Sequence, residues 1–326
     1  MRDSYPSFEA NGIKLYAVSY DDQETLREFA ESKGIQYPLL SDVDSAVIRD
    51  YGILNTQVSR DDGFLYGIPF PGVYVCDEDG VVVSKFFHDS YKKRESPEAY
   101  IDAALGRIQI DADAPQATGG EEDISITAAI RGGKGSIRQG IVRHLVVRFT
   151  LADGLHIYGE PVPKGLTATT VSLSGPEGLQ ILPTEFPPTE TLHLAAMDVN
   201  LEVWSGEVDL VVPFYPTGEL VSESRPLDGD SATLEIEVRY QACNDQECLL
   251  PRTEKFALEL PLDVVDVPNL SIHIGHGQRE GSYDSTPAMK RLLWRKIKSN
   301  PLGFPKFIWR NLRMQRAARK RVRDQG

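Results

Sequence analysis

The sequence has few cysteines and no long apolar run. Only three cysteines occur among its 326 residues, too few for the multi-disulfide scaffold of small secreted domains. No stretch of about 18 apolar residues is present, so no membrane-spanning helix is expected. No apolar segment follows the first residues, so they are not expected to act as a signal peptide. The three thiols therefore become the first candidates for chemistry.

Several other chemistries lack their sequence signatures. His273 and His276 lie three residues apart, but no carboxylate or cysteine cluster accompanies them, so no metal site is expected. There is no Gly-rich phosphate loop and no nucleophile signature of a Ser-His-Asp hydrolase. We expect neither a metal nor a cofactor.

Charge is distributed very unevenly along the chain. The net charge is −13, but residues 289–326 carry thirteen Lys or Arg and one Asp, a net charge of +12. The preceding residues carry 22 basic and 47 acidic side chains, a net charge of −25. An acidic body argues against nucleic acid as its main partner, and the basic tail has to be interpreted separately.

Two of the cysteines lie five positions apart in a short polar loop. Cys243 and Cys248 follow the strand-like run 232–240 and precede Pro251. A two-stranded turn can bring such a pair within the Cα separation that a disulfide needs, about 4.4–6.8 Å. Small exposed disulfides tend to be exchangeable. From the spacing alone, an ordinary surface disulfide or two free thiols remain alternatives.

The segment Tyr240-Gln241-Ala242-Cys243, with Cys248-Leu249-Leu250-Pro251 after the loop, resembles the active site of the N-terminal periplasmic domain of the thiol:disulfide interchange protein DsbD. The loop is about one residue shorter here than in the best-known member. That family has an immunoglobulin-like sandwich whose cysteine pair passes electrons to partner proteins. The resemblance implies that Cys243 and Cys248 are catalytic, that Tyr240 and Gln241 line the site, and that Cys248 engages the upstream donor.

A second segment, 153–158, matches the aromatic-rich motif that lines the cysteine pair in the same family. Tyr158 keeps the aromatic ring, and His156 stands where the best-known member has another tyrosine. A histidine close to a thiol favours the thiolate. The alternative is a half-exposed strand histidine without a role. The stretch 186–188, together with 204–206, is expected to supply a loop that covers the pair.

Residues 123–268 have the sequence pattern of a β-sandwich. Short alternating runs of strand length are separated by Gly, Pro and Asp turns, which is typical of an immunoglobulin-type fold. The expected strands are 124–130, 144–152, 169–174, 192–203, 207–214, 232–240 and 253–260. No Cys…Trp…Cys antibody pattern is present, so the fold class depends on the strand count and the resemblance.

Residues 1–110 have an α/β order of elements. The sequence predicts strands at 13–19 and 37–42, a helix at 24–33 with Leu26, Phe29 and Ala30 on its buried face, and a helix at 43–51. A hairpin at 72–87 and a helix at 96–105 follow. Asp22 is the expected N-cap of the first helix, and Gly34 its end.

Three segments of this region, 17–21, 37–42 and 74–80, resemble the peroxiredoxin (AhpC/TSA) branch of the thioredoxin superfamily. The resemblance implies a cis-proline at Pro71 that faces the active site. The reactive cysteine of that family lies on an earlier segment with no counterpart here, so the domain is expected to be N-terminally truncated. Cys76 is expected to be a small buried residue of a strand. Peroxidase activity is therefore not expected of this chain.

Residues 111–122 are rich in Asp, Ala, Gly and Glu, and we expect a linker there. Residues 269–326 form a second linker and a basic amphipathic helical tail, with apolar side chains including Leu293, Trp294 and Trp309. Such a tail suits a membrane surface, or intramolecular docking onto the acidic body. Nucleic acid is the least favoured partner, because no recognition motif accompanies the charge.

The sequence thus favours a thiol–disulfide oxidoreductase, an electron-relay protein that exchanges electrons with partner proteins through Cys243 and Cys248. The alternatives are a peroxiredoxin-like antioxidant protein without its peroxidatic segment, and a non-catalytic interaction protein built from redox-type modules. The resemblance implies the periplasm, whereas the sequence, without an export signal, fits the cytoplasm.

Overall fold

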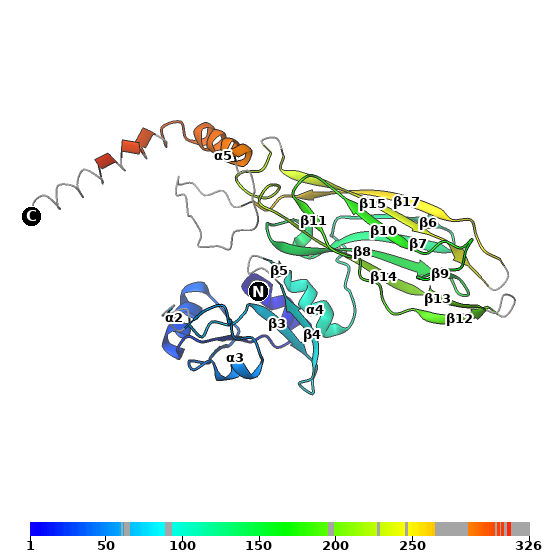
Figure 1. Ribbon diagram of the computed structural model, residues 1–326, viewed down its shortest axis with the longest axis horizontal. Coiled ribbons are helices and arrows are strands. Elements are labelled where there is room, and N and C mark those ends of the chain that lie inside the picture. The colour runs from blue at the N-terminus through cyan, green and yellow to red at the C-terminus, as the bar shows by residue number, and fades with distance from the viewer. Residues whose placement is uncertain are drawn as a thin grey trace, which may run out of the picture. The chain divides into compact units, whose positions relative to one another are not determined.

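The computed structural model contains an α/β region followed by a largely antiparallel β region (Figure 1). It describes the whole chain apart from residues 60, 62–65, 89–92, 195–198, 227–228, 245–246, 265–285, 304, 307, 310–311 and 314–326. The chain divides into two compact units. Unit 1 is Met1–Ala114 with Ala129–Lys134 and Ile141–Val146, and unit 2 is the remainder. Each unit is described by itself.

The elements of unit 1 follow the predicted order. The helices are α1 (Tyr5–Ala10), α2 (Gln23–Lys33), α3 (Ala46–Asp50) and α4 (Pro97–Leu105). The strands are β1 (Ala17–Ser19), β2 (Leu39–Ser41), β3 (Gly72–Cys76), β4 (Val82–Phe87) and β5 (Arg94–Glu95). β1 and β2 pair in parallel, and β3 and β4 form the predicted hairpin.

Local signals set the limits of α2 as predicted. The side chain of Asp22 accepts a hydrogen bond from the amide of Thr25 at 2.8 Å, which satisfies a free N–H of the first turn. Gly34 ends the helix in the left-handed conformation, with φ of 63°, where a residue without a Cβ meets no steric cost. The predicted N-cap and helix end are confirmed.

The predicted buried face of α2 is only partly correct. Leu26 is buried, but Phe29 is 49% exposed, because the two-stranded sheet β1–β2 beside the helix is narrow. The core of unit 1 lies instead around Phe8 of α1, Val75 of β3, and Tyr100 and Ile101 of α4. The expected strand at 13–19 is also shorter, since only Ala17–Ser19 pair as β1.

Two further expectations for unit 1 are wrong. Cys76 is exposed, not buried: alternation along β3 turns Val75 into the core, and the pairing with β4 becomes irregular between Val75 and Cys76. The bond before Pro71 is not cis; among the described residues the cis bond is Glu160–Pro161. The trans form at Pro71 is the intrinsically favoured isomer of an X–Pro bond.

A buried ion pair lies within unit 1. The Arg131 guanidinium donates two hydrogen bonds of 2.8 Å to the two carboxylate oxygens of Asp102, and one of 2.7 Å to Asp111. Arg131 and Asp102 are 5% and 10% exposed, whereas Asp111 is 48% exposed. Burial raises the pKa of Asp102, and the hydrogen bonds and charge of Arg131 counteract that effect. The cost of removing these two charges from water is therefore compensated by their mutual attraction and by the hydrogen bonds between them.

Most strands form the antiparallel β region. They are β6 (Gln116–Glu121), β7 (Ile124–Arg131), β8 (Ile141–Leu151), β9 (His156–Tyr158), β10 (Thr170–Ser174), β11 (Leu179–Ile181), β12 (Glu190–Leu194), β13 (Val199–Ser205), β14 (Glu207–Pro216), β15 (Ser231–Tyr240), β16 (Ala242–Cys243) and β17 (Arg252–Pro261). One sheet has the order β10-β15-β17, a second β11-β14-β8-β7-β6 and a third β12-β13-β9-β16. Strict alternation of buried and exposed residues along β15 turns one of its faces to the core.

Two details of the β region differ from the sequence prediction. The expected single strand at 192–203 is two antiparallel strands, β12 and β13, in which Leu192 pairs with Leu201. The expected linker at 111–122 contains strand β6. Glycines are uncommon inside strands, so the sequence pattern indicated a linker. Gly120 is required in this strand, because its φ is 105° and a Cβ there would lie 1.9 Å from the carbonyl oxygen of Ile124.

The basic tail begins with the amphipathic helix α5 (Thr286–Ser299), as the sequence predicts. His273 and His276 lie outside the described residues. Within the part of the chain that the structure describes, no helix is long and apolar enough to cross a membrane.

Candidate redox site

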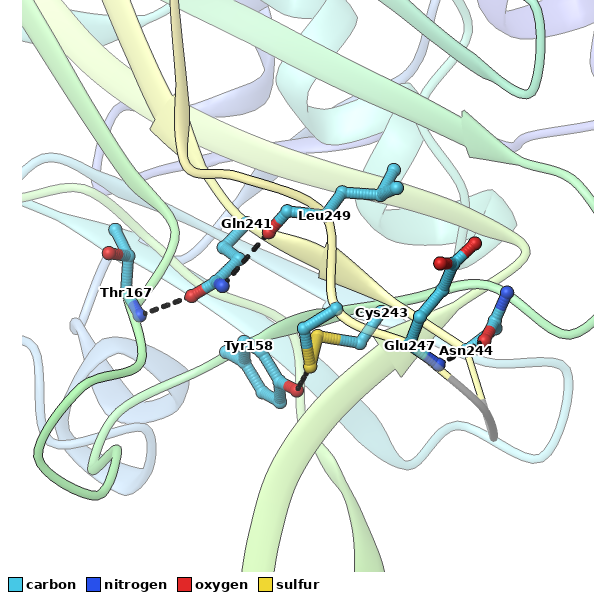
Figure 2. Close-up of a disulfide and its surroundings, with 8 residues drawn as sticks. Tyr158, Thr167, Gln241, Cys243, Asn244, Glu247 and Leu249 are labelled. Carbon is cyan, nitrogen blue, oxygen red and sulfur yellow. Dashed lines mark hydrogen bonds between the residues drawn. A yellow bond between two sulfur atoms is a disulfide. The ribbon is translucent and has the colours of Figure 1, made fainter.

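Cys243 and Cys248 are bonded to each other, with their Cα atoms 4.1 Å apart. The backbone around them is held as a tight turn: the amide of Asn244 donates to the carbonyl of Glu247 at 2.9 Å, and the amide of Leu249 to the carbonyl of Ala242 at 2.8 Å. The Asn244 side chain also accepts from the amide of Glu247 (Figure 2). The turn therefore presents the two cysteines side by side.

The two cysteines differ sharply in exposure. Cys243, in β16, is 1% exposed and packs in a cluster with Tyr158, Leu201 and Val203. Cys248 is exposed, and so are the leucines that follow it, of which Leu250 is 83% exposed. Another protein can therefore approach the disulfide from the side of Cys248.

The short strand β9 brings the second predicted segment to the disulfide. β9 lies between β13 and β16, with His156 opposite Cys243 and Tyr158 opposite Val203. Directly paired residues point to the same face of a sheet, and residues two apart share that face. His156, Tyr158 and Cys243 therefore lie on one face.

Tyr158 contacts the sulfur of Cys248, the exposed cysteine of the pair. Its hydroxyl lies 3.4 Å from Sγ of Cys248 (Figure 2), and its side chain is 2% exposed. Burial raises the pKa of Tyr158 above its usual value of 10. Because a group with a raised pKa keeps its proton up to a higher pH, this hydroxyl is neutral at pH 7 and can donate a hydrogen bond to a sulfur.

His156 supports the ring of Tyr158. The two rings meet edge to face with centroids 5.5 Å apart, and His156 is 8% exposed. The alternative interpretation, a half-exposed strand histidine, is wrong about its exposure, because β9 has neighbouring strands on both sides.

Gln241 connects the cysteine turn to a distant loop. Its side-chain oxygen accepts from the amide of Thr167 at 2.8 Å, and its side-chain nitrogen donates to the carbonyl of Leu249 at 3.0 Å (Figure 2). Gln241 is 6% exposed, so both bonds are largely shielded from water. Thr167 had no sequence signal, since it is 74 positions away from Gln241.

Replacement of Gln241 by leucine is expected to release the Thr167 loop. The change leaves a shielded N–H and a shielded C=O without partners, at a cost of about 1–3 kcal/mol each. Amide hydrogen exchange at Thr167 should become faster in the oxidised protein. Gln241→Glu, which keeps the acceptor for Thr167, is the matched control and should preserve protection there. Equal protection of the Thr167 amide in the unaltered protein and in both variants would show that Gln241 does not hold this loop.

Two other candidate residues, Tyr240 and Pro71, are described by their own surroundings. The ring of Tyr240 packs edge to face on Phe149 in the core, 5.4 Å between centroids. Burial, with the carboxylates of Glu121 and Glu254, raises the pKa of Tyr240 to about 12. Pro71 belongs to unit 1 and is half-buried before β3.

The expected covering loop also lies elsewhere. Phe186 stacks on Trp204, with centroids 5.9 Å apart, and the indole N–H of Trp204 donates to the carbonyl of Pro187 at 3.1 Å. Trp204 pairs with Ile157, the residue between His156 and Tyr158. Alternation therefore puts Trp204 on the face of the sheet opposite to that of Cys243.

Comparison with known families matches two parts of the chain. Residues 1–85 match the AhpC/TSA family, and residues 134–260 match the family described as thiol:disulfide interchange protein DsbD, N-terminal. The second match contains the disulfide, β9 and Gln241.

Similar curated proteins include peroxiredoxins. A chloroplastic peroxiredoxin Q of Arabidopsis thaliana is 33% identical over 105 residues, which is 32% of this chain and 43% of that protein. A putative peroxiredoxin of Mycobacterium tuberculosis is 33% identical over 86 residues, 25% of this chain and 51% of that protein. The chain spans about half the length of these relatives.

Two solved structures can each be superposed on 46% of this chain. The N-terminal periplasmic domain of ScsB from Proteus mirabilis shares 13% identity, with 52% of that chain covered and a TM-score of 0.32. The reduced N-terminal domain of DsbD from Neisseria meningitidis shares 14%, with 86% covered and a TM-score of 0.24. The two family matches by themselves show an AhpC/TSA (peroxiredoxin) domain at residues 1–85 followed by a domain like the N-terminal domain of DsbD.

Proposed function

We propose that this protein is a thiol–disulfide oxidoreductase that exchanges electrons with partner proteins through Cys243 and Cys248. The observation that carries the proposal is the asymmetry of the pair: Cys248 is exposed on a polar turn while Cys243 is buried beneath it. A purely structural disulfide has no need of an exposed cysteine at the surface, whereas an exchanging one needs access for a second protein.

The exchange begins at Cys248. A thiolate of a reduced partner dithiol attacks Sγ of Cys248, the Cys243–Cys248 bond breaks, and Cys243 leaves with the electron pair and takes a proton. A mixed disulfide now joins Cys248 to the partner. The second thiolate of the partner attacks the partner sulfur in that bond and releases Cys248 as a thiolate. The partner is oxidised to a disulfide, and the cysteine pair of this chain gains two electrons.

Tyr158 stabilises the Cys248 thiolate when it is released. Its neutral hydroxyl is already 3.4 Å from that sulfur, and a hydrogen bond to a charged group contributes about 1.5–3 kcal/mol. The donor is held in place by the buried edge-to-face contact with His156, so little reorganisation is needed when the charge appears.

Tyr158→Phe is expected to slow alkylation of Cys248 by iodoacetamide in the reduced protein about tenfold at neutral pH, because loss of the hydrogen bond lowers the fraction of thiolate. The rate is measured by mass spectrometry of the Cys248 peptide. Tyr16→Phe, which changes a 54% exposed tyrosine of unit 1, is the control and should leave the rate unchanged. An unaltered rate in Tyr158→Phe would exclude the proposed donor.

The reduction potential of the pair tests the function as a whole. Equilibration of the full chain with glutathione buffers should give a potential above about −300 mV, in the range of exchangeable disulfides. A lower potential would mark a structural bond and favour the non-catalytic interaction protein. Cys76→Ser should not alter the result, because Cys76 is outside the pair.

A peroxiredoxin-like activity is the second candidate. The match of residues 1–85 to the AhpC/TSA family and the exposed free thiol of Cys76 favour it. Peroxidase chemistry requires an activated thiolate, and Cys76 is the one thiol outside the pair in this sequence. Peroxide consumption that disappears in Cys76→Ser would support this candidate, and consumption equal to the buffer rate would reject it.

A further inference from the structure

Three cationic side chains hold helix α5 to a loop of unit 2. Nε of Arg291 donates to the carbonyl of Ser224 at 2.7 Å, and Nη2 of Arg295, one turn further, donates to the carbonyl of Pro226 at 2.9 Å. Lys296 forms an ion pair with Glu223. All three cationic side chains bind one loop, residues 222–226. They therefore identify the side of the helix that is docked.

The opposite side of α5 is apolar and exposed. At 100° per residue, Met289, Leu293 and Ile297 form a stripe one turn apart, and they are 42%, 38% and 45% exposed. Trp294, 59% exposed, lies beside this stripe. The docked residues Arg291 and Arg295 fall on the other half of the helix, so both surfaces can be occupied at once.

Positive charge borders the stripe. Lys290 and Lys298 are exposed on the same half of the helix as Leu293 and Trp294. Further along the chain Trp309 is 64% exposed, and the guanidinium of Arg313 lies over its ring, 5.4 Å from the centroid. The residues from 289 to 326 together carry a net charge of +12.

We propose that the exposed side of α5 binds the surface of a lipid bilayer that contains anionic lipids. An amphipathic helix with Trp and Leu on one face and lysines along its edge lies in the interface, with its apolar side chains in the acyl region and its charges at the headgroups. Because α5 is held to the loop at 222–226 by its other side, binding brings unit 2 to the membrane.

Charge and shape favour lipid over two other occupants. Nucleic acid would contact the lysines through its phosphates but leave the stripe of Met289, Leu293 and Ile297 in water. A second copy of α5 would bring two strongly basic tails together and would be disfavoured by like-charge repulsion. An anionic bilayer both buries the apolar stripe and attracts the basic side chains.

Vesicle binding by the full chain tests the proposal. Binding to vesicles of equal parts phosphatidylcholine and phosphatidylglycerol is expected to be at least about tenfold tighter than to phosphatidylcholine alone, since an anionic surface attracts basic side chains that lie near it. Fluorescence of Trp294 and Trp309 should shift to the blue on binding, because the third tryptophan, Trp204, is already buried.

The double variant Leu293→Ser, Trp294→Ser is expected to lose at least about tenfold in affinity for the mixed vesicles. The control Phe29→Ser, Val43→Ser removes apolar side chains of unit 1 that are 49% and 61% exposed, and should bind like the unaltered protein. Equal affinity for both vesicle types, or undiminished binding by the tail variant, would overturn the proposal. So would a lipid-free dimer or a DNA complex that the tail variant abolishes.

Discussion

Replacement of Cys243 by serine is expected to trap partner proteins, whereas replacement of Cys248 is expected to abolish all exchange. In Cys243→Ser the exposed Cys248 thiol still attacks a partner disulfide, but the resolving thiol is absent and the mixed disulfide persists. In Cys248→Ser the remaining thiol is 1% exposed, so the partner sulfur cannot approach it. Non-reducing electrophoresis after incubation with an oxidised thioredoxin-type protein measures the difference.

Stability does not account for this difference. Loss of a bond between cysteines five positions apart removes about 2 kcal/mol by loop-closure entropy, and it does so equally in both variants. Cys243→Ser should have the lower unfolding midpoint, because its hydroxyl replaces the sulfur of a residue that is 1% exposed in the core, and yet it should be the variant that traps the partner. Equal trapping by the two variants would contradict the assignment of Cys248 as the entry point. Trapping that disappears in Cys243→Ser, Cys76→Ser would instead implicate Cys76.

Arg131→Met is expected to destabilise unit 1 by about 3–5 kcal/mol, because it leaves the buried carboxylate of Asp102 without its bidentate partner. Urea denaturation measures the loss. Arg148→Met is the matched control: Arg148 also makes two bonds of 2.7 Å to one aspartate, Asp209, but that pair is 22% and 20% exposed. Water solvates the remaining Asp209 carboxylate, so the loss there should be much smaller.

The destabilisation by Arg131→Met should depend on pH in a definite direction. The pKa of Asp102 is already raised by burial, and the variant removes the charge that counteracts this effect. A carboxyl group whose folded pKa exceeds its unfolded value favours the native state more as the pH falls. The variant should therefore recover stability between neutral pH and the unfolded pKa of aspartate, about 3.9. Arg131→Met, Asp102→Asn should lose this pH dependence, and its persistence would exclude Asp102 as the cause.

Local signals in the sequence predicted much of the fold. Asp22 and Gly34 mark helix limits that the structure reproduces, and these signals act within one turn of chain. The cysteine segment and the segment of Tyr158 were predicted by resemblance, and the structure brings both to one site. Such features depend on neighbours in sequence or on a pattern already known.

Features that depend on tertiary pairing were missed. β9 and β16 are three and two residues long, too short for an alternating pattern, yet they position the disulfide. The bridge from Gln241 to Thr167 crosses 74 positions. Cys76 was expected inside because its neighbours are apolar, but the phase of alternation along β3 is set by Val75 in the core.

The exposure of Cys76 makes the molecule convenient to label. In the oxidised protein the other two thiols are consumed by the disulfide, so a maleimide dye applied without reductant attaches at a single defined atom. The same exposure makes air-driven crosslinking between molecules a hazard during storage. A serine at that position would remove the hazard and leave the cysteine pair untouched.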